Sequence, residues 1–283
     1  MRINTNLSAM IATNQMTKNT ALAGNSMEKL STGLRITKAG DDAAGLAISE
    51  KMRAQIRGME QAERNVQDGI SLVQTAEGAL EESGNILQRM RELTVQGAND
   101  TLVEEDRDKI KEELTQLGQE LGKIADETKF NGKELLKGKA TLSTDNTTTV
   151  FEGTMTINVQ AGANKETREI VIANLASIAS TVGGLTVTST GDAQASEALI
   201  DTALTDVNTA RANLGAMQNR LEYTSSNLVT STENLTAAES RIRDVDVAKE
   251  MVKLSKLNIL NQASQAMVSQ AKQQPESVAQ LLR

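Results

Sequence analysis

A short stretch between two segments of helical character contains residues that could bind a phosphate group or a cation. The stretch STGLRITKAGDDAAGLAIS contains three glycines and an acidic pair. Gly33, Gly40 and Gly45 are spaced seven and five residues apart, and this spacing matches neither the dinucleotide fingerprint nor the phosphate-binding loop. Asp41 and Asp42 could bind a cation, but two adjacent carboxylates without further oxygen ligands make a weak site.

A structural interpretation of the same stretch is stronger. Gly40 can end one segment in a left-handed conformation. Asp41 or Asp42 can then cap the next helix, because an aspartate accepts from the free N–H groups of the first turn and favours its positive end. The sequence therefore predicts a joint between two helices.

The composition limits which functions are open. The chain of 283 residues has no His and no Cys, which excludes Ser-His-Asp and Cys-His catalysis and zinc sites built from His or Cys. Carboxylate pairs and a Ser-Lys dyad remain formally open. Aromatic residues make up 1% of the chain and there is one proline. This composition is more typical of long helices packed side by side than of an enzyme with a shaped ligand-binding pocket. We expect no enzyme activity, no cofactor and no metal.

Charge and hydropathy restrict the partners. The start, MRINTNLSAM, lacks the apolar run of a secretory signal, and no apolar stretch is long enough for a transmembrane helix. Both ends of the chain are net basic and the middle is acidic, but the basic residues are scattered and have no aromatic platforms beside them. We therefore expect neither a nucleic-acid partner nor a membrane partner.

Seven-residue apolar repeats organise most of the chain. They predict long helices in coiled-coil packing with a left-handed supercoil. The first repeat comprises Met52, Met59, Val66, Val73, Leu80 and Leu87, and a shorter one Val103, Ile110, Leu117 and Ile124, interleaved with Leu114 and Leu121. The last comprises Ile200, Val207, Leu214, Leu221, Leu228, Leu235 and Ile242.

Glycines interrupt the first long helix. Each costs about 1 kcal/mol relative to Ala in a helix interior. Either this weakness is tolerated, or a neighbouring helix or subunit approaches the backbone closely. The residues concerned are Gly58, Gly69, Gly78, Gly84 and Gly97.

The two ends also have helical periodicity, with apolar bands too wide for one seam. A helix that is apolar on several sides is buried on several sides, so we expect the ends to become ordered only on assembly. Pro275 is expected to end the last helix. The bands contain Ile3, Leu7, Met10, Asn14, Thr17 and Ala21 at one end, and Val245, Val252, Ile259 and Ala266 with flanking Leu, Met and Ala at the other.

The character changes between about residues 141 and 190. TVFEGTMTINVQ, TREIVIANL and LTVTST alternate apolar and polar residues and are rich in Thr, Val and Ile, which predicts short strands. The predicted fold is mainly α: a long coiled-coil helix bundle formed by the N- and C-terminal segments, with a small β-rich insertion in the middle.

Motifs along the whole helical part of the chain closely resemble those of bacterial flagellins. The resemblance covers LSTGLRITKAGDDAAGLAISEKMRAQIRG, NVQDGISLVQTAEGAL, LQRMRELTVQGAN, RANLGAMQNRLEYTSSNL, NLTAAESRIRDVDVAKEM and ILNQASQAMVSQAKQQPESVAQLLR. It implies a structural subunit of a helical filament used for swimming. A hook–filament junction protein is the alternative.

The resemblance also implies a domain plan and a set of partners. Residues 1–43 and 243–283 would form the inner coiled-coil tube, residues 44–140 and 191–242 a helical shell, and residues 141–190 a small β-rich part of that shell, with no large outer domain. Export would follow the flagellar type III route as unfolded chain, so the subunit would be extracellular. Implied partners are further copies of the chain, the export apparatus and its chaperone, the filament cap, hook-junction proteins and a host Toll-like receptor.

Three groups of residues are expected to carry these roles. The expected polymerisation core consists of Ile3, Leu7, Met10, Val252, Leu257, Ile259, Leu260 and Met267. Shell helix packing is expected of Met52, Met59, Val66, Val73, Leu80, Leu87, Leu214, Leu221, Leu228 and Leu235. By resemblance, receptor recognition falls to Arg89, Leu93 and Glu113, with Leu93 as an apolar anchor beside Arg89.

Overall fold

The computed structural model describes residues 6–142, 149–152 and 154–281. The chain divides into two compact units: Met1–Ile56 together with Glu233–Arg283, here called the terminal unit, and Arg57–Thr232, here called the central unit. The prediction of a mainly α fold with a small β-rich insertion is confirmed. Ile3 of the expected polymerisation core lies outside the described residues.

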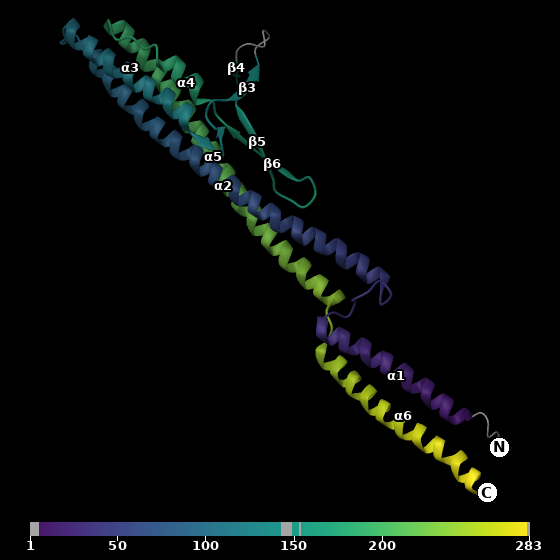
Figure 1. Cartoon of the computed structure of the whole chain (residues 1–283). Helices are drawn as coiled ribbons and strands as arrows, with labels where there is room; N and C mark the ends of the chain where they lie inside the picture. The colour runs from purple at the N-terminus through teal and green to yellow at the C-terminus, as the bar shows by residue number, and fades with distance from the viewer. Residues whose placement is uncertain (1–5, 143–148, 153, 282–283) are drawn as a thin grey trace. The chain divides into compact units, whose positions relative to one another are not determined.

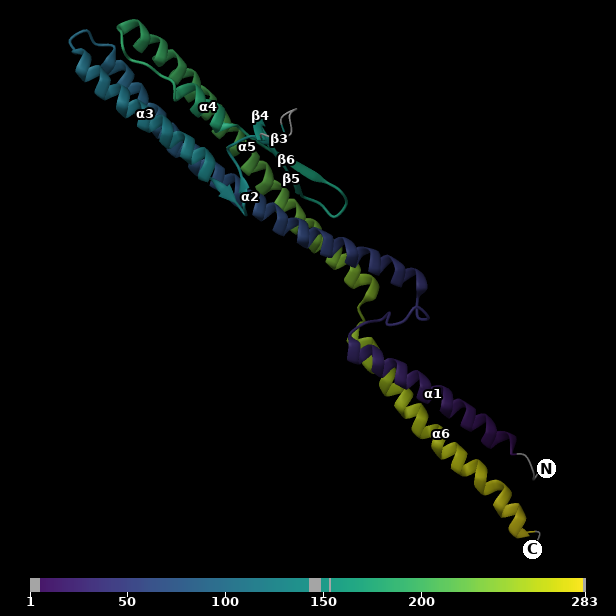
Figure 2. The same cartoon turned by 45° about the horizontal axis from the view of Figure 1, so that its top comes forward.

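The terminal unit is built around two helices from opposite ends of the chain. Helix α1 spans Leu7–Thr32 and helix α6 spans Val247–Leu281. They lie side by side in both views, in purple and yellow (Figures 1 and 2). The unit also contains the beginning of α2 (Ala43–Gly97) and the end of α5 (Thr190–Arg243).

Helix α6 corrects one expectation. It does not end at Pro275 but continues to Leu281. Proline lacks one backbone N–H and so removes one helical hydrogen bond, yet α6 continues past this position.

The central unit buries the predicted heptad stripes. Met59, Val66, Val73, Leu80 and Leu87 of α2 are all buried. A second buried row lies three residues after each of them and consists mostly of small residues: Ala62, Gly69, Ala76, Ser83 and Met90. Alternation of three and four residues is the pattern of a coiled-coil seam, and the small second row lets neighbouring chain approach closely.

Helix α5 presents the matching stripe. Its buried side includes Ile200, Val207, Leu214, Leu221 and Leu228. Val207 lies near Gly84 of α2, and Leu221 approaches Gly69, so these two stripes face each other within the central unit. Two further residues of the expected shell packing, Met52 and Leu235, belong to the terminal unit and are partly exposed.

In the shorter helix α3, Glu104–Glu127, three of the six residues of the expected pattern are buried, namely Ile110, Leu114 and Leu121. Its buried residues are Ile110, Leu114, Gly118, Leu121 and Ala125. Val103 is the N-cap residue and is exposed, and Leu117 and Ile124 are half-buried. The burial of Gly118 follows from α4 (Leu175–Val182), which packs on α3 and brings the backbone of Gly183 against this glycine.

Three antiparallel hairpins make up the β structure of the described residues. Strands β1 (Lys129–Phe130) and β2 (Lys133–Glu134) flank Asn131 and Gly132, which both have positive φ, as a two-residue hairpin loop requires. The other hairpins pair β3 (Lys139–Leu142) with β4 (Thr149–Glu152) and β5 (Met155–Gln160) with β6 (Thr167–Ile172).

The predicted strand at LTVTST is wrong, and a helix within this region was not expected. Residues 185–189 have no regular structure, and α5 begins at Thr190. The Thr186 carbonyl accepts from the Ser196 hydroxyl instead of from a neighbouring strand. The predicted strands at TVFE, MTINVQ and TREIVI are confirmed.

The glycines of α2 have more than one explanation. A Cβ at Gly58 would lie 2.9 Å from the Cβ of Ala163 and 3.3 Å from its Cα, so the turn after β5 makes the close approach there. Gly78 has no other part of the chain within 4 Å. The approaching segment at Gly58 is thus a hairpin of the same chain and not a helix.

Candidate assembly surface and joint

The joint after α1 forms, but at a different glycine. Gly33 adopts φ 72° at the C-cap of α1, a conformation that favours glycine because it has no Cβ. Gly40 is not among the residues of positive φ. The correction shortens α1 and leaves residues 34–42 as the connecting segment.

The two aspartates of the joint have separate tasks. Asp42 is the cap of α2, since its Oδ1 accepts from the Gly45 backbone N–H at 2.9 Å. A Cβ at Gly45 would lie 2.5 Å from Asp42 Oδ2 and 2.7 Å from Ile36 Cδ1. Gly45 thus makes room for both the cap and the buried Ile36.

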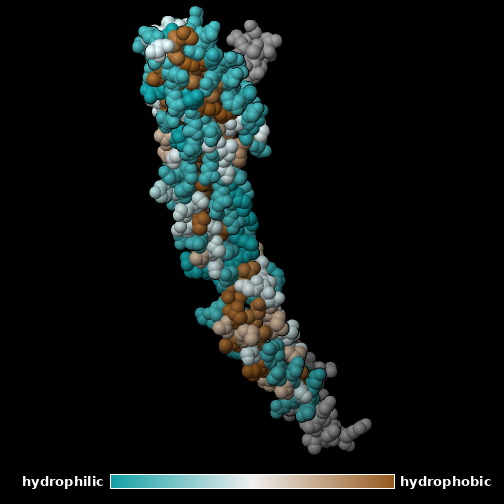
Figure 3. All heavy atoms as spheres, turned by 90° about the vertical axis from the view of Figure 1, so that its left-hand side faces the viewer, coloured by the Kyte–Doolittle hydropathy of each residue, from teal (hydrophilic) through white to brown (hydrophobic). Residues whose placement is uncertain are grey.

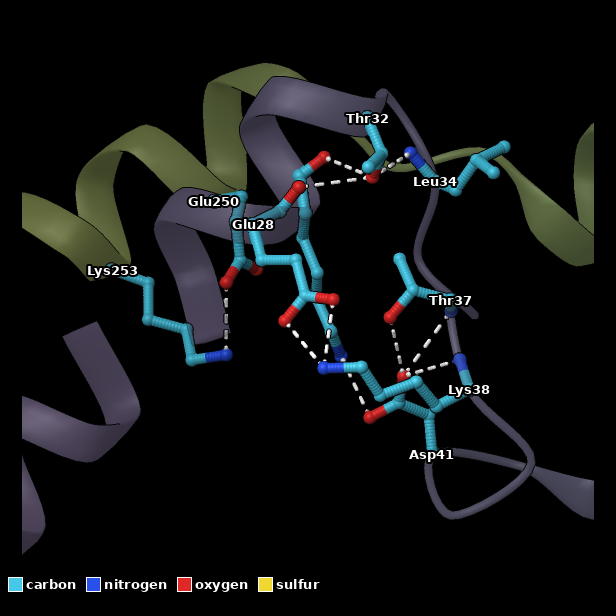
Figure 4. A network of polar contacts seen from close by, with 9 residues as sticks. Glu28, Thr32, Leu34, Thr37, Lys38, Asp41, Glu250 and Lys253 are labelled. Atoms are coloured by element: carbon cyan, nitrogen blue, oxygen red, sulfur yellow. Dashed lines mark hydrogen bonds and ion pairs between the residues drawn. The ribbon is translucent and has the colours of Figure 1, made fainter. Parts of the chain in front are cut away.

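Asp41 closes the connecting segment on itself. One carboxylate oxygen, Oδ2, accepts from the backbone N–H groups of Thr37 and Lys38 and from the Thr37 hydroxyl at 3.0–3.2 Å (Figure 4). Its other oxygen lies 3.9 Å from Lys29 Nζ. The Thr37 N–H, followed by the Lys38 N–H, lowers the pKa of the Asp41 carboxyl below its ordinary value of 3.8.

A short antiparallel bridge joins this connecting segment to the one between α5 and α6. Leu34 pairs with Asp244. The Arg35 N–H donates to the Arg243 carbonyl at 2.6 Å, and the Val245 N–H donates to the Gly33 carbonyl at 3.0 Å. This bridge was not predicted from the sequence, because no local pattern indicates a pairing between residues about 210 positions apart.

The joint contributes acid-sensitive stability. A carboxyl with a lowered folded-state pKa stabilises the fold above its unfolded value and loses that contribution as pH falls through the folded value. We expect the melting temperature of the wild type to decrease as the pH is lowered below about 4. The melting temperature of Asp41→Asn should decrease less over the same pH range. Circular dichroism melts from about pH 2.5 to 7 check this, with the exposed Asp68→Asn as the control. Parallel curves for wild type and Asp41→Asn would contradict the assignment.

The seam between α1 and α6 is made of small and polar residues. Asn19, Ser26 and Ser264 are at least nine-tenths buried in it. The row on α1 consists of Ala9, Ala12, Met16, Asn19, Ala23, Ser26 and Leu30, and the row on α6 of Glu250, Leu254, Leu257, Asn261, Ser264, Val268 and Ala271; Glu28 and Lys29 of α1 are half-buried as well. Both rows alternate by three and four residues, so the pairing is coiled-coil-like but buries few large apolar groups.

Most of the large apolar side chains of these two helices lie outside the seam and are exposed. The space-filling view shows apolar residues gathered on the surface over the terminal helices, in the lower half of the picture (Figure 3). Exposed members are Leu7, Met10, Ile11, Leu22, Met27, Val247, Met251, Val252, Ile259, Leu260 and Met267, here called the outer apolar face. Contiguous exposed apolar surface of this kind marks an interaction site.

The expected polymerisation core divides between these two surfaces. Leu7, Met10, Val252, Ile259, Leu260 and Met267 lie on the outer apolar face. Leu257 is 7% exposed and lies in the row that faces α1. Leu257 therefore packs within its own chain and not on the outer apolar face.

The residues expected to contact a receptor lie in the central unit and are not all at the surface. The guanidinium of Arg89, half-exposed on α2, binds Glu113 of α3 at 3.0 Å and Glu92 at 3.2 Å. Glu113, followed by Glu92, raises the pKa of Arg89. Leu93 is only 2% exposed, so it does not form the apolar surface anchor that was expected beside Arg89.

Within the described ranges, no group of three or more Asp or Glu residues is placed to hold a metal ion. The helices described there include none that is both long enough and apolar enough to cross a membrane. What the structure offers is pairs of long helices and an apolar outer face.

Comparison with known proteins decides the family. Residues 3–141 match the model of the bacterial flagellin N-terminal helical region, and residues 198–282 match that of the C-terminal helical region. The chain belongs to the bacterial flagellin family. This flagellin is a structural subunit of the flagellar filament and not an enzyme.

Relatives match over their entire length. The chain is 53% identical to a flagellin of Halalkalibacterium halodurans and 48% identical to a flagellin of Bacillus subtilis, with 100% of both chains covered in each case. A protein from Vibrio parahaemolyticus described as flagellar hook-associated shares the fold at a TM-score of 0.58 and 16% identity, over 72% of this chain and 100% of its own. The hook–filament junction alternative gains no support from this pattern.

Proposed function

We propose that this flagellin polymerises through the outer apolar face of α1 and α6. The observation that carries the proposal is that most of the large apolar side chains of the two helices are exposed, while the seam between the helices is rich in small and polar residues. Each large side chain that becomes buried contributes about 1.5–3 kcal/mol before ordering costs. A contact between different faces of identical subunits does not close on itself, and so it generates a helical tube.

In this proposal the domain plan follows the filament. Residues 1–43 and 243–283 line the inner tube, residues 44–140 and 191–242 form the shell around it, and residues 141–190 are a small β-rich part of that shell. The heptad stripes of α2 and α5 hold the shell portion of each subunit together. They comprise Met52, Met59, Val66, Val73, Leu80 and Leu87 on α2, and Leu214, Leu221, Leu228 and Leu235 on α5.

The remaining partners follow from the flagellin family. The subunit is exported unfolded through the flagellar type III apparatus with the help of a chaperone, and it is extracellular once assembled. It contacts the hook-junction proteins at the base of the filament and the cap at its tip, and the filament serves swimming. A chaperone has a clear physical task, because the outer apolar face is an aggregation hazard until it is covered.

The terminal helices should resist protease only after assembly. In the monomer, their seam buries few large groups, so both helices open readily. We expect limited proteolysis to trim about forty residues from each end of the monomer and to spare the same residues in seeded filaments. Mass spectrometry of the fragments measures this. Protease-resistant ends in the monomer would contradict the proposal, and the central unit serves as an internal standard.

A second role is proposed for the monomer, as a ligand of a host Toll-like receptor. The half-exposed pair of Arg89 and Glu113 offers a fixed guanidinium and carboxylate. Arginine is enriched at the centres of protein interfaces. Leu93 is buried and therefore offers no exposed contact surface beside the pair.

Receptor-reporter assays test this role. We expect the wild-type monomer to be active, and Arg89→Ala or Glu113→Ala each to lower its potency roughly ten-fold, as the loss of an interface hot spot does. Arg64→Ala, a substitution of an arginine elsewhere on α2, is the control. A silent wild type, or full activity in both variants, would refute the assignment.

A further inference from the structure

Helix α6 contains one carbonyl group that its own backbone cannot satisfy in the ordinary way. An α-helix pairs each carbonyl with the N–H four residues further on. For Ala271 that position is Pro275, which has no N–H, and yet α6 continues to Leu281. The carbonyl of Ala271, a half-buried residue, is therefore left open to a donor from outside the helix.

Asn6 supplies that donor from the other end of the chain. Its side-chain Nδ2 donates to the Ala271 carbonyl at 2.6 Å, across 265 positions of sequence. The other atom of the same amide, Oδ1, accepts from the Ala9 N–H at 3.1 Å and caps α1. One side chain thus completes the start of α1 and the interrupted hydrogen-bond ladder of α6.

The surrounding seam makes such an anchor necessary. Small side chains such as those of Ala9, Ala12 and Ala23 interdigitate little with the facing helix. They therefore resist sliding of one helix along the other only weakly. Another side-chain hydrogen bond between α1 and α6, from the Thr20 hydroxyl to Asn261 Oδ1, is long at 3.5 Å. A polar group that finds its partner in one alignment alone fixes the register of a helix pair.

We propose that Asn6 and Pro275 form a register lock for the terminal helices. Displacement of α1 by a helical turn would place the Asn6 amide beside carbonyls that already have helical donors, and would leave Ala271 unpaired. The lock thereby sets which outward side chains of α1 and α6 lie level with each other in the outer apolar face. This inference rests on the proposed polymerisation through that face.

A double-mutant cycle tests the lock in the full-length chain. Asn6→Ser and Asn6→Asp both retain an acceptor for the α1 cap, whereas neither can donate as the Asn6 amide does. Pro275→Ala restores the N–H that Ala271 lacks. The measured quantity is the monomer concentration that remains when seeded filaments reach equilibrium, determined by sedimentation.

We expect each Asn6 variant to raise that concentration about two- to ten-fold when Pro275 is present. When the same substitutions are combined with Pro275→Ala, they should change it less than about two-fold, because the helix then satisfies its own carbonyl. Equal effects in both backgrounds, or no effect in either, would overturn the lock. A wild type that does not polymerise would refute the proposed function instead.

A second measurement uses wild-type filaments alone, and so it does not depend on whether the variants assemble. Solid-state NMR on wild-type filaments carrying isotope-labelled Asn and Ala should show proximity between the Asn6 amide nitrogen and the Ala271 carbonyl carbon. Its presence supports the lock. Its absence in well-ordered filaments would overturn the lock irrespective of the variants.

Discussion

Replacement of Val252 and Ile259 together with glutamate should abolish filament growth. These side chains are 71% and 62% exposed, lie seven residues apart, and so share one stripe of the outer apolar face. Assembly would have to bury two carboxylates without partners, at a cost of several kcal/mol each. We expect the concentration needed for polymerisation to rise at least about 100-fold, as measured by sedimentation and electron microscopy after seeding.

The matched control and the folded state make this result interpretable. Lys256→Gln is the control: this exposed residue lies four residues after Val252 and three before Ile259, on the same side of the helix, and because the change introduces no carboxylate it should affect filament yield far less than the double glutamate variant. Thermal unfolding of the central unit should be the same in all variants. Normal filament yield from the double glutamate variant would place the assembly contact elsewhere.

Truncation of two leucines three residues apart distinguishes the role of the seam from the role of the outer apolar face. Leu257→Ala opens a cavity between α1 and α6, at a cost of about 2–5 kcal/mol. Leu260→Ala removes a side chain that is exposed in the monomer. We therefore expect the first to loosen the helix pair before assembly and the second to weaken assembly alone. Circular dichroism melts of the monomer and sedimentation of seeded filaments measure the two effects.

The second large effect is expected in the seam of the central unit. Leu87→Ala removes a fully buried side chain of α2 and should lower the free energy of unfolding by about 2–5 kcal/mol. Urea unfolding followed by circular dichroism measures the change. The exposed Val95→Ala on the same helix is the control and should cost less than about 0.5 kcal/mol. A similar loss in both variants would show that Leu87 is not packed as described.

Prediction from sequence succeeded where a period alone carries the information. Met59, Val66, Val73 and Leu80 repeat every seven residues, and all of them are buried in the central unit. A heptad places every member on one side of a helix whatever its partner is, so no knowledge of the partner was needed. The hairpin strands at MTINVQ and TREIVI are readable for the same reason, since alternation determines which face each residue takes.

The same reasoning failed where several turn residues compete. Gly33, Gly40, Asp41 and Asp42 could each have ended or begun a helix. The choice of Gly33 and Asp42 depends on the bridge of Leu34 to Asp244 and on the space beside Ile36. Those partners come from distant parts of the chain, so local propensity could not rank the alternatives.

Helix faces show the limit most clearly. The spacing on α1 pointed to the stripe through Leu7 and Met10, and yet α1 packs on α6 through Ala9, Ala12 and Asn19. Leu93 lies four residues from exposed Arg89 but is buried. Two residues at this spacing lie on the same side of a helix, and yet one of them can be covered by a neighbouring element while the other remains exposed.

The sequence by itself determined the class of the protein: its long heptad helices, its short strands, its lack of His and Cys, and the motifs shared with flagellins. All of these are properties of spacing and residue type, which the chain carries without folding. Only the tertiary structure decided which side of each terminal helix meets its partner. It also decided which glycine turns the joint and which donor reaches the carbonyl left open by Pro275. Such choices depend on contacts between residues up to 265 positions apart, and these contacts exist only once the two ends of the chain lie side by side.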